Sequence, residues 1–264
     1  MSNFIKRITS GIIYVLLFIS FVLISKETYI ILISVFGFLC IWEFSKMIYL
    51  KNIVPYILLP IVMVYFYYYG SDKNNLLLLG ITLLCSVRLI YHLFSENNTY
   101  PKTFISKLDL CIRYIIFPIS FLILLPFTNN QYNGTFVIFI LIILWVNDSF
   151  AFLVGKNFGK HKLFERISPK KTIEGFVGGA VFSVITASII AKYTTTFSTL
   201  NWIFIALIVV IFGTLGDLVE SKFKRQAKIK DSGNIMPGHG GILDRLDSLL
   251  FSSPFIYLYI HYLM

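Results

Sequence analysis

Acidic side chains are concentrated in the second half of this sequence, where several fall inside or beside long apolar runs. Eight of the 13 Asp and Glu residues lie from Asp148 onward. Asp217 and Glu220 end one apolar run, and Asp244 and Asp247 open another. The spacing of three places both members of each pair on one face of a helix. Ionisable groups at membrane depth are costly and mark functional sites, so these acids indicate chemistry at the membrane.

The chemistry that such carboxylates favour is binding of a hard divalent cation. Mg²⁺ takes one or two carboxylates together with water and substrate phosphates. The predicted metal ligands are Asp217, Asp244, Asp148, Glu220 and Asp247. The alternative is that the acids form structural ion pairs, for example Asp217 with Lys224 or Asp244 with Arg245.

Basic residues surround these acids in two clusters. The first contains Lys222, Lys224, Arg225, Lys228 and Lys230, and the second, in Ser168–Gly175, contains Lys170 and Lys171. Arg and Lys bind and neutralise phosphoryl oxygens, so the clusters predict a site for several phosphates. Basic cytoplasmic loops also set topology and attract anionic headgroups, and this alternative stays open for each lysine. Ser168 followed by Pro169 resembles a helix start, which would aim free N–H groups at an anion.

Between the first basic cluster and Asp244 lies the glycine-rich segment Pro237–Gly241. It is unsuited to a helix and suited to bringing backbone N–H groups against a phosphate. His239 within it could contact a phosphate or hold the turn, and it has no partner for zinc. Gly175 and Gly179 have the spacing that permits close helix packing. The sequence lacks a Walker A loop, an HExxH motif and a GxSxG motif, which argues against common ATPases, zinc proteases and serine hydrolases.

The elements that must position these residues are transmembrane helices. Of the 264 residues 57% are hydrophobic and only 14% charged, far more apolar than a soluble domain. A membrane-spanning helix needs about 20 mostly apolar residues. Apolar runs predict nine spans, at about 9–25, 28–45, 53–70, 76–94, 110–127, 135–155, 173–193, 202–221 and 247–263. The fold class is therefore an all-α integral membrane protein, with soft boundaries where spans contain Glu43 and Arg88.

The distribution of Lys and Arg predicts the orientation of these spans. With a cytoplasmic N-terminus, nearly all of the basic loops fall on the cytoplasmic side, and only Lys26, Lys73 and Lys192 fall outside. The C-terminus is then external and the acids lie near the cytoplasmic face. We expect one multi-pass domain over residues 1–264 in the cell membrane, with N-terminal spans in 1–135 and the catalytic spans and loops in 136–264.

The segment Ser221–Ser248 carries a specific motif. It contains Ser-x-x-Lys-Arg, then Lys230-Asp231, then Pro-Gly-His-Gly-Gly-x-x-Asp-Arg-x-Asp-Ser, over 28 residues. It resembles the signature of the phosphatidate cytidylyltransferases, also called CDP-diacylglycerol synthases. Asn147-Asp148, Ser168–Thr172 and Gly216–Ser221 also resemble that family, and Met236 is a minor departure in side-chain bulk. The resemblance covers roughly the second half of the chain.

The resemblance implies attack of the phosphatidate phosphate on the α-phosphorus of CTP, with Mg²⁺ and a second, monovalent cation such as K⁺. A phosphomonoester is already ionised at neutral pH, so the protein must mainly offset the repulsion of two polyanions. The expected catalytic residues are Asp217, Asp244, Lys224, Arg225, Lys230, His239 and Arg245. The expected substrate-binding residues are Ser168, Lys170, Lys171, Ser221, Asp231, Gly240 and Gly241.

Two other functions compete with this interpretation. A CTP-dependent polyprenol kinase is the nearest rival enzyme, but the complete glycine-rich motif favours the cytidylyltransferase. A transporter would also carry intramembrane acids, but these acids gather at one face and not at the midplane. The expected partners are CTP and membrane phosphatidate, without nucleic acid, and the resemblance also implies a homodimer.

Overall fold

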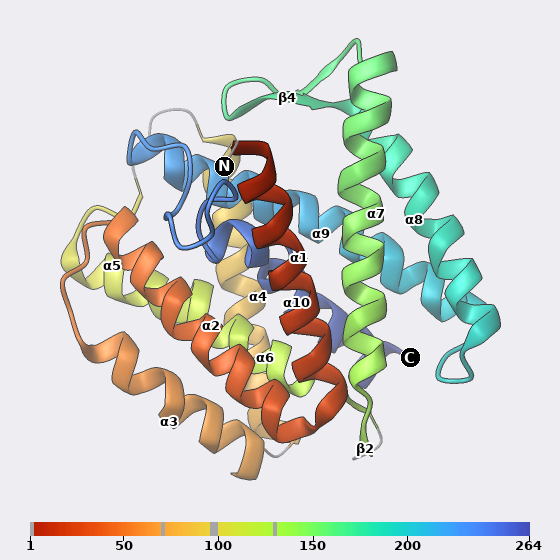
Figure 1. Ribbon diagram of the computed structural model, residues 1–264. Coiled ribbons are helices and arrows are strands. Elements are labelled where there is room, and N and C mark those ends of the chain that lie inside the picture. Colours follow the sequence, from red (N-terminus) through yellow and green to blue (C-terminus); the bar gives the residue numbers. More distant parts are fainter. Residues whose placement is uncertain (1–2, 70–71, 96–99, 129–130) are drawn as a thin grey trace.

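The protein is a bundle of helices with two short β-hairpins (Figure 1). The computed structural model describes residues 3–69, 72–95, 100–128 and 131–264. The helices of the first half are α1 (Asn3–Ile24), α2 (Lys26–Met47), α3 (Val54–Tyr69), α4 (Asp72–Phe94), α5 (Phe104–Cys111), the π-helical η1 (Ile112–Ile116) and α6 (Phe117–Leu124). The second half contains α7 (Gly134–Phe158), α8 (Ile173–Tyr193), α9 (Thr199–Gln226), α10 (Leu243–Leu258) and the π-helical η2 (Tyr259–Leu263).

Each of the nine segments predicted as a span is helical over most of its described residues, but only six of the described helices are long and apolar enough to cross a membrane. These six run over Arg7–Ile24, Lys26–Met47, Asn74–Phe94, Gly134–Phe158, Ile173–Tyr193 and Thr199–Gln226. Of the other three, α3 is short, the segment 104–124 changes to π-helix in its middle, and α10 passes into η2. The protein is thus a multi-pass, mostly helical membrane protein, and the count of nine stays a prediction.

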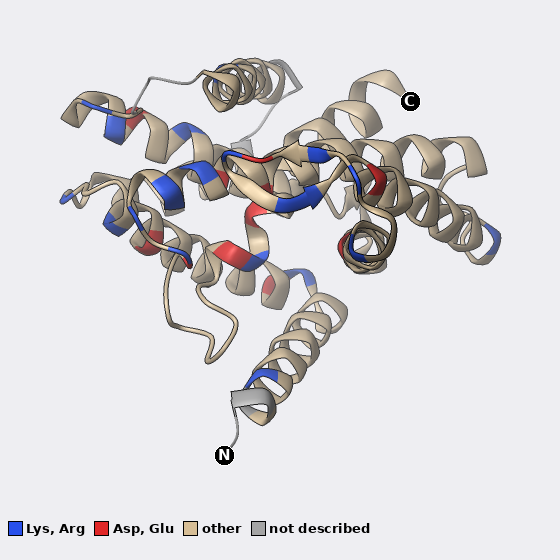
Figure 2. Cartoon of the chain, turned by 90° about the horizontal axis from the view of Figure 1, so that it is seen from above, with Lys and Arg blue, Asp and Glu red and all other residues tan. Residues whose placement is uncertain are grey.

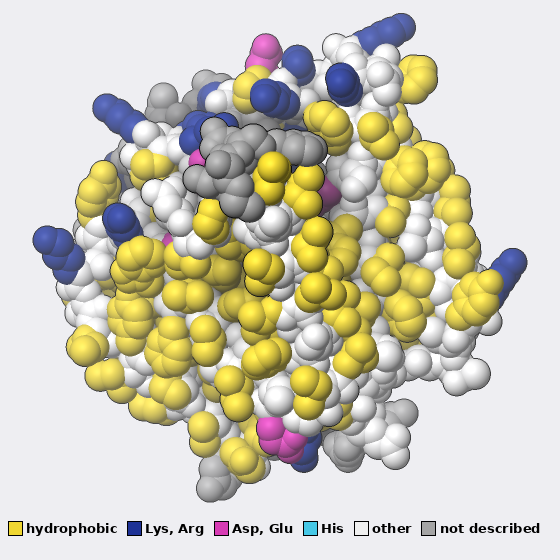
Figure 3. Space-filling model, viewed as in Figure 1, with side chains coloured by type: hydrophobic (Ala, Val, Ile, Leu, Met, Phe, Trp, Pro, Cys, Tyr) yellow, Lys and Arg dark blue, Asp and Glu magenta, His cyan; other side chains and the backbone are white. Residues whose placement is uncertain are grey.

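The surface of the bundle is that of a protein surrounded by lipid. Large apolar side chains such as Ile12, Leu16 and Leu84 are more than half exposed. Hydrophobic side chains cover the middle of the face in Figure 3, and several Lys and Arg side chains gather at its upper edge. Figure 2 views the molecule from that end, where basic and acidic segments lie close together. The start of α1 and the hairpin formed by β3 (Lys162–Phe164) and β4 (Ser168–Thr172) also lie at this end of Figure 1, which is called the polar end below.

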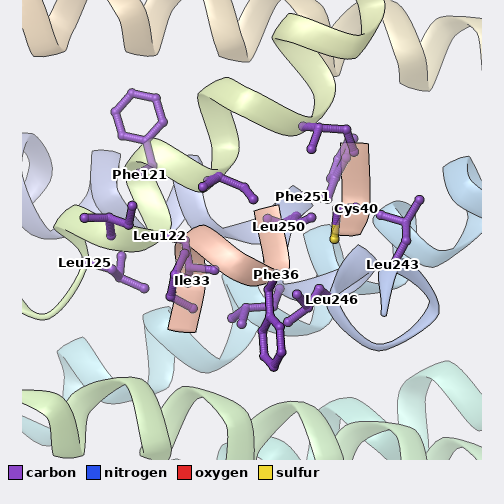
Figure 4. Packing of buried hydrophobic residues seen from close by; sticks show 14 of the residues in the cluster. Ile33, Phe36, Cys40, Phe121, Leu122, Leu125, Leu243, Leu246, Leu250 and Phe251 are labelled. Atoms are coloured by element: carbon purple, nitrogen blue, oxygen red, sulfur yellow. The ribbon is translucent and has the colours of Figure 1, made fainter. Parts of the chain in front are cut away.

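Helix α10 lies inside the bundle, where it packs against α2, α4, α6, α7 and α9. Figure 4 shows its residues Leu243, Leu246 and Leu250 in the same buried cluster as Phe36 of α2 and Leu122 of α6. All five side chains are buried. Because neighbouring helices enclose α10, the charged residues of its first turn are held by the protein and not by lipid.

Helices α7 and α8 pack closely where glycines face the partner helix. A Cβ on Gly178 would lie 2.6 Å from the Val154 side chain, and one on Gly179 would lie 2.5 Å from the Asn147 side chain. A Cβ on Gly175 would lie 2.6 Å from the Ala151 carbonyl oxygen. The prediction that Gly175 and Gly179 serve close helix packing is confirmed, and this contact fixes α7 against α8 below the β3–β4 hairpin.

Candidate active site

The β3–β4 hairpin joins α7 to α8 at the polar end and carries the second basic cluster. Strand β3 (Lys162–Phe164) pairs antiparallel with β4 (Ser168–Thr172), with Phe164 opposite Ser168. The prediction that Ser168 caps the next helix is wrong, because the cap is Thr172, whose hydroxyl accepts a hydrogen bond from the Gly175 N–H at 3.1 Å. A residue before proline avoids helical backbone, which explains why Ser168 continues the strand.

A cavity of about 290 Å³ lies between this hairpin and helices α7, α8 and α9. Its polar lining is Asn147, Asp148, Ser168, Lys170, Lys171, Thr172, Thr214 and Asp217. Phe152, Leu163 and Phe176 supply apolar walls. The structure therefore gathers five of the predicted site residues, from three separate segments of the sequence, around one space.

Asp217 and Lys171 form an ion pair at the edge of this cavity. The Lys171 Nζ lies 2.5 Å from the Asp217 Oδ2, with 28% and 34% of the two side chains exposed. The Ser221 hydroxyl donates to the other carboxylate oxygen at 3.1 Å. Asp148 on α7 interacts electrostatically with both members of the pair. The predicted alternative pair of Asp217 with Lys224 is therefore replaced by a pair with a lysine of the hairpin.

Deeper in the bundle, Lys224 joins α9 to α10. Its Nζ contacts the Glu220 Oε2 one turn earlier on α9 and lies 2.7 Å from the Asp244 Oδ1. The Lys224, Glu220 and Asp244 side chains are only 10%, 0% and 6% exposed. The second Asp244 oxygen accepts hydrogen bonds from the Ser232 N–H at 2.8 Å and the Gly241 N–H at 2.7 Å, and it lies 2.9 Å from the Ser232 hydroxyl oxygen. Asp244 is thus fully hydrogen-bonded within the protein.

The five predicted metal ligands form one electrostatic group. The buried Asp247 interacts with Asp217 and Asp148, and Glu220 interacts with Asp247 and Asp244. One oxygen of Glu220, Oε1, is buried without a hydrogen-bond partner. Asp148 is exposed and the other four acids are buried or partly buried. Their mutual repulsion needs compensating positive charge, and Lys171 and Lys224 supply part of it.

The donor chemistry of this group suits a hard divalent cation. Its ligand atoms are carboxylate oxygens, Asp217 and Asp244 each already contact a lysine ammonium, and the Glu220 Oε1 lacks a partner. Within the described part of the chain, no three or more Asp, Glu, His or Cys groups are already arranged as a metal-binding cluster. The ligand atoms are therefore of the type that Mg²⁺ binds. In this structure Lys171 and Lys224 lie against the same acids and neutralise part of their charge.

The glycine-rich segment forms a tight turn against α1. Met236 pairs with Gly240, and Gly238 and Gly240 have φ of +79° and +89°, which glycine adopts at little cost. The Arg7 Nε of α1 donates to the Gly238 carbonyl at 2.6 Å, and Ser10 Oγ lies 2.9 Å from the His239 Nδ1. The turn is therefore attached to the first helix of the chain.

Backbone N–H groups along this turn already have acceptors. Those of His239 and Gly240 donate to the Met236 carbonyl, and that of Gly241 donates to Asp244. Gly240 and Gly241 consequently shape the turn in this structure, and their contact with a phosphate stays a prediction. Around this turn, side chains are therefore freer than the backbone N–H groups to bind an anion.

Several of the predicted catalytic and substrate-binding residues are exposed: Lys170 on the β3–β4 hairpin, and Arg225, Lys230, Asp231 and Arg245. Arg245 donates to the His239 carbonyl at 2.8 Å, so the predicted alternative of an Asp244–Arg245 ion pair does not occur. Arg225 donates to the Ile229 carbonyl at 3.3 Å. Burial, followed by the charges of Arg245 and Arg7, holds the pKa of His239 below its usual value.

Residues of the first half also reach the site, and the sequence reasoning did not assign them a role. Glu43 of α2 accepts hydrogen bonds from Ser232, Ile242 and Leu243 at the start of α10. Arg7 and Ser10 of α1 hold the glycine-rich turn. In the sequence, Glu43 is an acid inside a predicted span, and such a residue indicates a functional site. The sequence analysis uses it only to mark a soft span boundary.

These elements define a helical membrane protein with lysine-paired acids at one end. The chain belongs to the Cytidylyltransferase family, whose sequence profile matches residues 5–263. It is 36% identical to the phosphatidate cytidylyltransferase of Bacillus subtilis (strain 168), with 96% of each chain covered. It is 33% identical to the phosphatidate cytidylyltransferase of Staphylococcus haemolyticus (strain JCSC1435), with 95% of this chain and 96% of the relative covered. The enzyme of that name from Staphylococcus aureus (strain COL) is 50% identical over 46% of this chain and 47% of its own.

Proposed function

We propose that this protein is a phosphatidate cytidylyltransferase, which transfers CMP from CTP to phosphatidate and releases pyrophosphate. Family membership and the names of relatives that match nearly the full chain support this substrate pair. The observation that carries the proposal is the polar cavity of about 290 Å³ in which Lys171 meets Asp217 at the end of a membrane bundle. A site there is accessible to a lipid phosphate and to a soluble nucleotide.

The reaction needs charge compensation more than proton transfer. A phosphate oxygen of phosphatidate forms a bond to the α-phosphorus of CTP, and the bond from that phosphorus to the oxygen of the β-phosphate breaks. The attacking phosphate is already an anion at neutral pH, so the main barrier is the approach of two polyanions. Lysine and arginine side chains around the cavity reduce this repulsion.

Roles for the residues follow from their positions. Lys170 and Lys171 on the hairpin contact phosphates in the cavity, with Ser168 beside them. Lys224 keeps Glu220 and Asp244 in place, and Ser221 orients Asp217. The exposed Arg225, Lys230 and Arg245 bind phosphates at the mouth, Asp231 and His239 position the glycine-rich turn, and Gly240 and Gly241 give it its shape.

The carboxylates give the site its metal-binding capacity. Asp217 and Asp244 are the proposed ligands of Mg²⁺, with Asp148, Glu220 and Asp247 as further ligands or their hydrogen-bonding neighbours. When bound, Mg²⁺ and a second, monovalent cation such as K⁺ would neutralise phosphate charge and polarise the α-phosphate. In the same state Lys171 would be released from Asp217 to bind a substrate phosphate.

For the membrane arrangement, we propose nine spans with the N-terminus in the cytoplasm and the polar end at the cytoplasmic face of the cell membrane. The basic loops on that side support this orientation. It puts the cavity at the level of the phosphatidate headgroup and in reach of cytoplasmic CTP. A homodimer is proposed from the family resemblance alone.

Purified protein in detergent, supplied with phosphatidate and CTP labelled on the α-phosphate, tests the reaction. Labelled CDP-diacylglycerol should form with Mg²⁺, should stop when the metal is chelated, and should be absent with Asp244→Ala. Asp109→Asn, which alters a partly exposed ion pair with Arg113 in the first half, is the matched control and should keep activity. In a parallel assay with CTP labelled on the γ-phosphate, labelled lipid would indicate a kinase, and no product from folded wild-type protein in either assay would overturn the proposal.

A further inference from the structure

Glu43 is a fully buried acid of α2 that reaches the catalytic half of the chain. Its Oε1 accepts a hydrogen bond from the Ile242 N–H at 3.1 Å. Its Oε2 accepts from the Leu243 N–H at 2.8 Å and from the Ser232 hydroxyl at 3.0 Å. The side chain is 0% exposed. One carboxylate thus binds three donors from a segment about 190–200 residues further along the chain.

The segment around Glu43 is shaped to receive a carboxylate. A Cβ on Gly233 would lie 2.9 Å from the Glu43 Cδ. A Cβ on Gly241 would overlap both Glu43 oxygens. Glycine therefore stands at both places where the loop passes over this side chain, and larger residues there would push the carboxylate away from its donors.

Glu43 also serves as the cap of α10. The helix begins after Ile242, whose own side chain makes no capping hydrogen bond. The first N–H groups of a helix need acceptors, and the helix dipole favours an anion at that end. The Glu43 carboxylate provides the acceptor oxygens and can provide the negative charge. Among the described residues it forms no ion pair with Lys, Arg or His. The backbone at the start of α10 is therefore its main electrostatic partner.

Ser232 connects Glu43 to the candidate active site. Its Oγ lies 3.0 Å from the Glu43 Oε2 and 2.9 Å from the Asp244 Oδ2. Asp244 in turn contacts Lys224, which contacts Glu220 on α9. A continuous polar chain thus runs from α2 through Ser232 to the acids of α9 and α10.

We propose that Glu43 is a positioning residue for CMP transfer, a role that rests on the proposed function. It fixes the start of α10 and the Ser232 hydroxyl, and so sets the orientation of Asp244 and Arg245. The alternative is that Glu43 only anchors α2 to α10 and contributes to stability. A positioning role predicts that substitution of Glu43 lowers turnover by the folded enzyme. A purely anchoring role predicts that stability falls and turnover by the folded enzyme does not.

Three variants at position 43 separate these roles. Glu43→Gln keeps the size but replaces one acceptor oxygen with an NH₂ group, which faces N–H or O–H donors and cannot accept from them. A buried donor left without an acceptor is destabilising, because it has given up its hydrogen bonds to water. Glu43→Asp keeps the charge with a shorter reach, and Glu43→Ala removes every contact. The matched control is Glu27→Gln, because Glu27 is an exposed acid at the other end of the same helix.

The measurements are kcat and KM for CTP per folded enzyme, the melting temperature in detergent, and hydrogen exchange of the peptide covering 232–243. We expect Glu43→Gln to lower kcat about 10-fold with a smaller change in KM, and to speed exchange at Ile242 and Leu243. Glu43→Asp should recover part of kcat, and Glu27→Gln should match wild type.

The possible failures are distinguishable. A Glu43→Gln variant that melts earlier but keeps wild-type kcat per folded molecule would overturn the positioning role alone. Wild-type exchange at Ile242 and Leu243 in that variant would also overturn it, even with reduced turnover. Absence of CDP-diacylglycerol from folded wild-type protein would overturn the proposed function, and this role with it.

Discussion

Two lysine–carboxylate contacts in the same site differ in where the lysine comes from and how deeply it lies. Lys171 reaches Asp217 from a two-stranded hairpin, and both side chains are about one-third exposed. Lys224 lies inside the bundle, where it contacts Glu220 and Asp244 with at most one-tenth of any of the three side chains exposed. The first contact can open without disturbing the helices, whereas the second is part of the packing of α9 against α10.

This difference separates the residues proposed to bind substrate from residues that hold the site together. A partly exposed pair is worth little to stability because water screens it. A buried lysine between two acids is different, because its removal leaves buried charge without compensation. Substitutions at the two lysines and their acids should therefore affect stability and turnover in different proportions.

The largest effect is expected from Lys224→Met. The variant leaves Glu220 and Asp244 buried without a cation, which should destabilise the fold by about 3–5 kcal/mol and abolish turnover. Thermal unfolding in detergent measures the first effect and CDP-diacylglycerol formation the second. Lys192→Met, at an exposed position on α8, is the control and should melt like wild type. A Lys224→Met protein with an unchanged melting temperature would contradict the structural role of this lysine.

Asp217→Asn should lower turnover strongly and stability only slightly. It weakens the contact with Lys171 and removes a proposed metal ligand, so kcat should fall about 100-fold or more. Because the pair is partly exposed, the free energy of unfolding should change by about 1 kcal/mol or less. The control is Asp109→Asn, which removes charge from a comparably exposed pair with Arg113 and should leave kcat unchanged. Equal losses in kcat for Asp217→Asn and Asp109→Asn would show that the effect of Asp217 is not specific to the site, whereas a loss of several kcal/mol of stability in Asp217→Asn would remove the distinction between the two lysine contacts.

The sequence predicted the parts of this comparison that depend on local spacing. The spacing of Asp217 and Glu220 and the apolar run before them placed two acids near the end of one helix, as the structure has them. The partners of these acids could not be predicted, because Lys171 comes from a hairpin about 45 residues earlier in the chain. That hairpin was itself missed, and Ser168 was assigned to a helix start that belongs to Thr172.

The other differences between the sequence-based predictions and the structure also come from tertiary contacts. Glu43 stood in the sequence as one charge in an apolar run, and only the fold shows that it meets the start of α10. The glycines of Pro237–Gly241 correctly predicted a loop, but not that His239 would dock on Ser10. Composition and motif thus define the membrane class and the family, whereas ion-pair partners and caps depend on how distant segments meet.

His239 gives the smallest expected effect and tests whether the turn on α1 is a separate, loosely held part of the site. Burial and the charges of Arg245 and Arg7 lower its pKa in the folded protein, so the folded state favours neutral His239. The stabilising contribution of the neutral ring is present above the unfolded pKa of about 6.5 and is lost as the pH falls through the lower folded value. After correction for the slower intrinsic exchange of amides at acidic pH, residues 236–241 should therefore be less protected from hydrogen exchange at acidic pH than at neutral pH.

His239→Gln should remove most of this pH dependence, because glutamine can still bond to the Ser10 hydroxyl but does not titrate. His161→Gln, on the exposed end of the β3–β4 hairpin, is the matched control and should retain the wild-type behaviour. Protection in the Lys224 region of α9, corrected in the same way, should not change over this pH range, because buried helix packing holds it and the His239 turn does not. A loss of protection at acidic pH that persists in His239→Gln would show that another group controls how the turn is held.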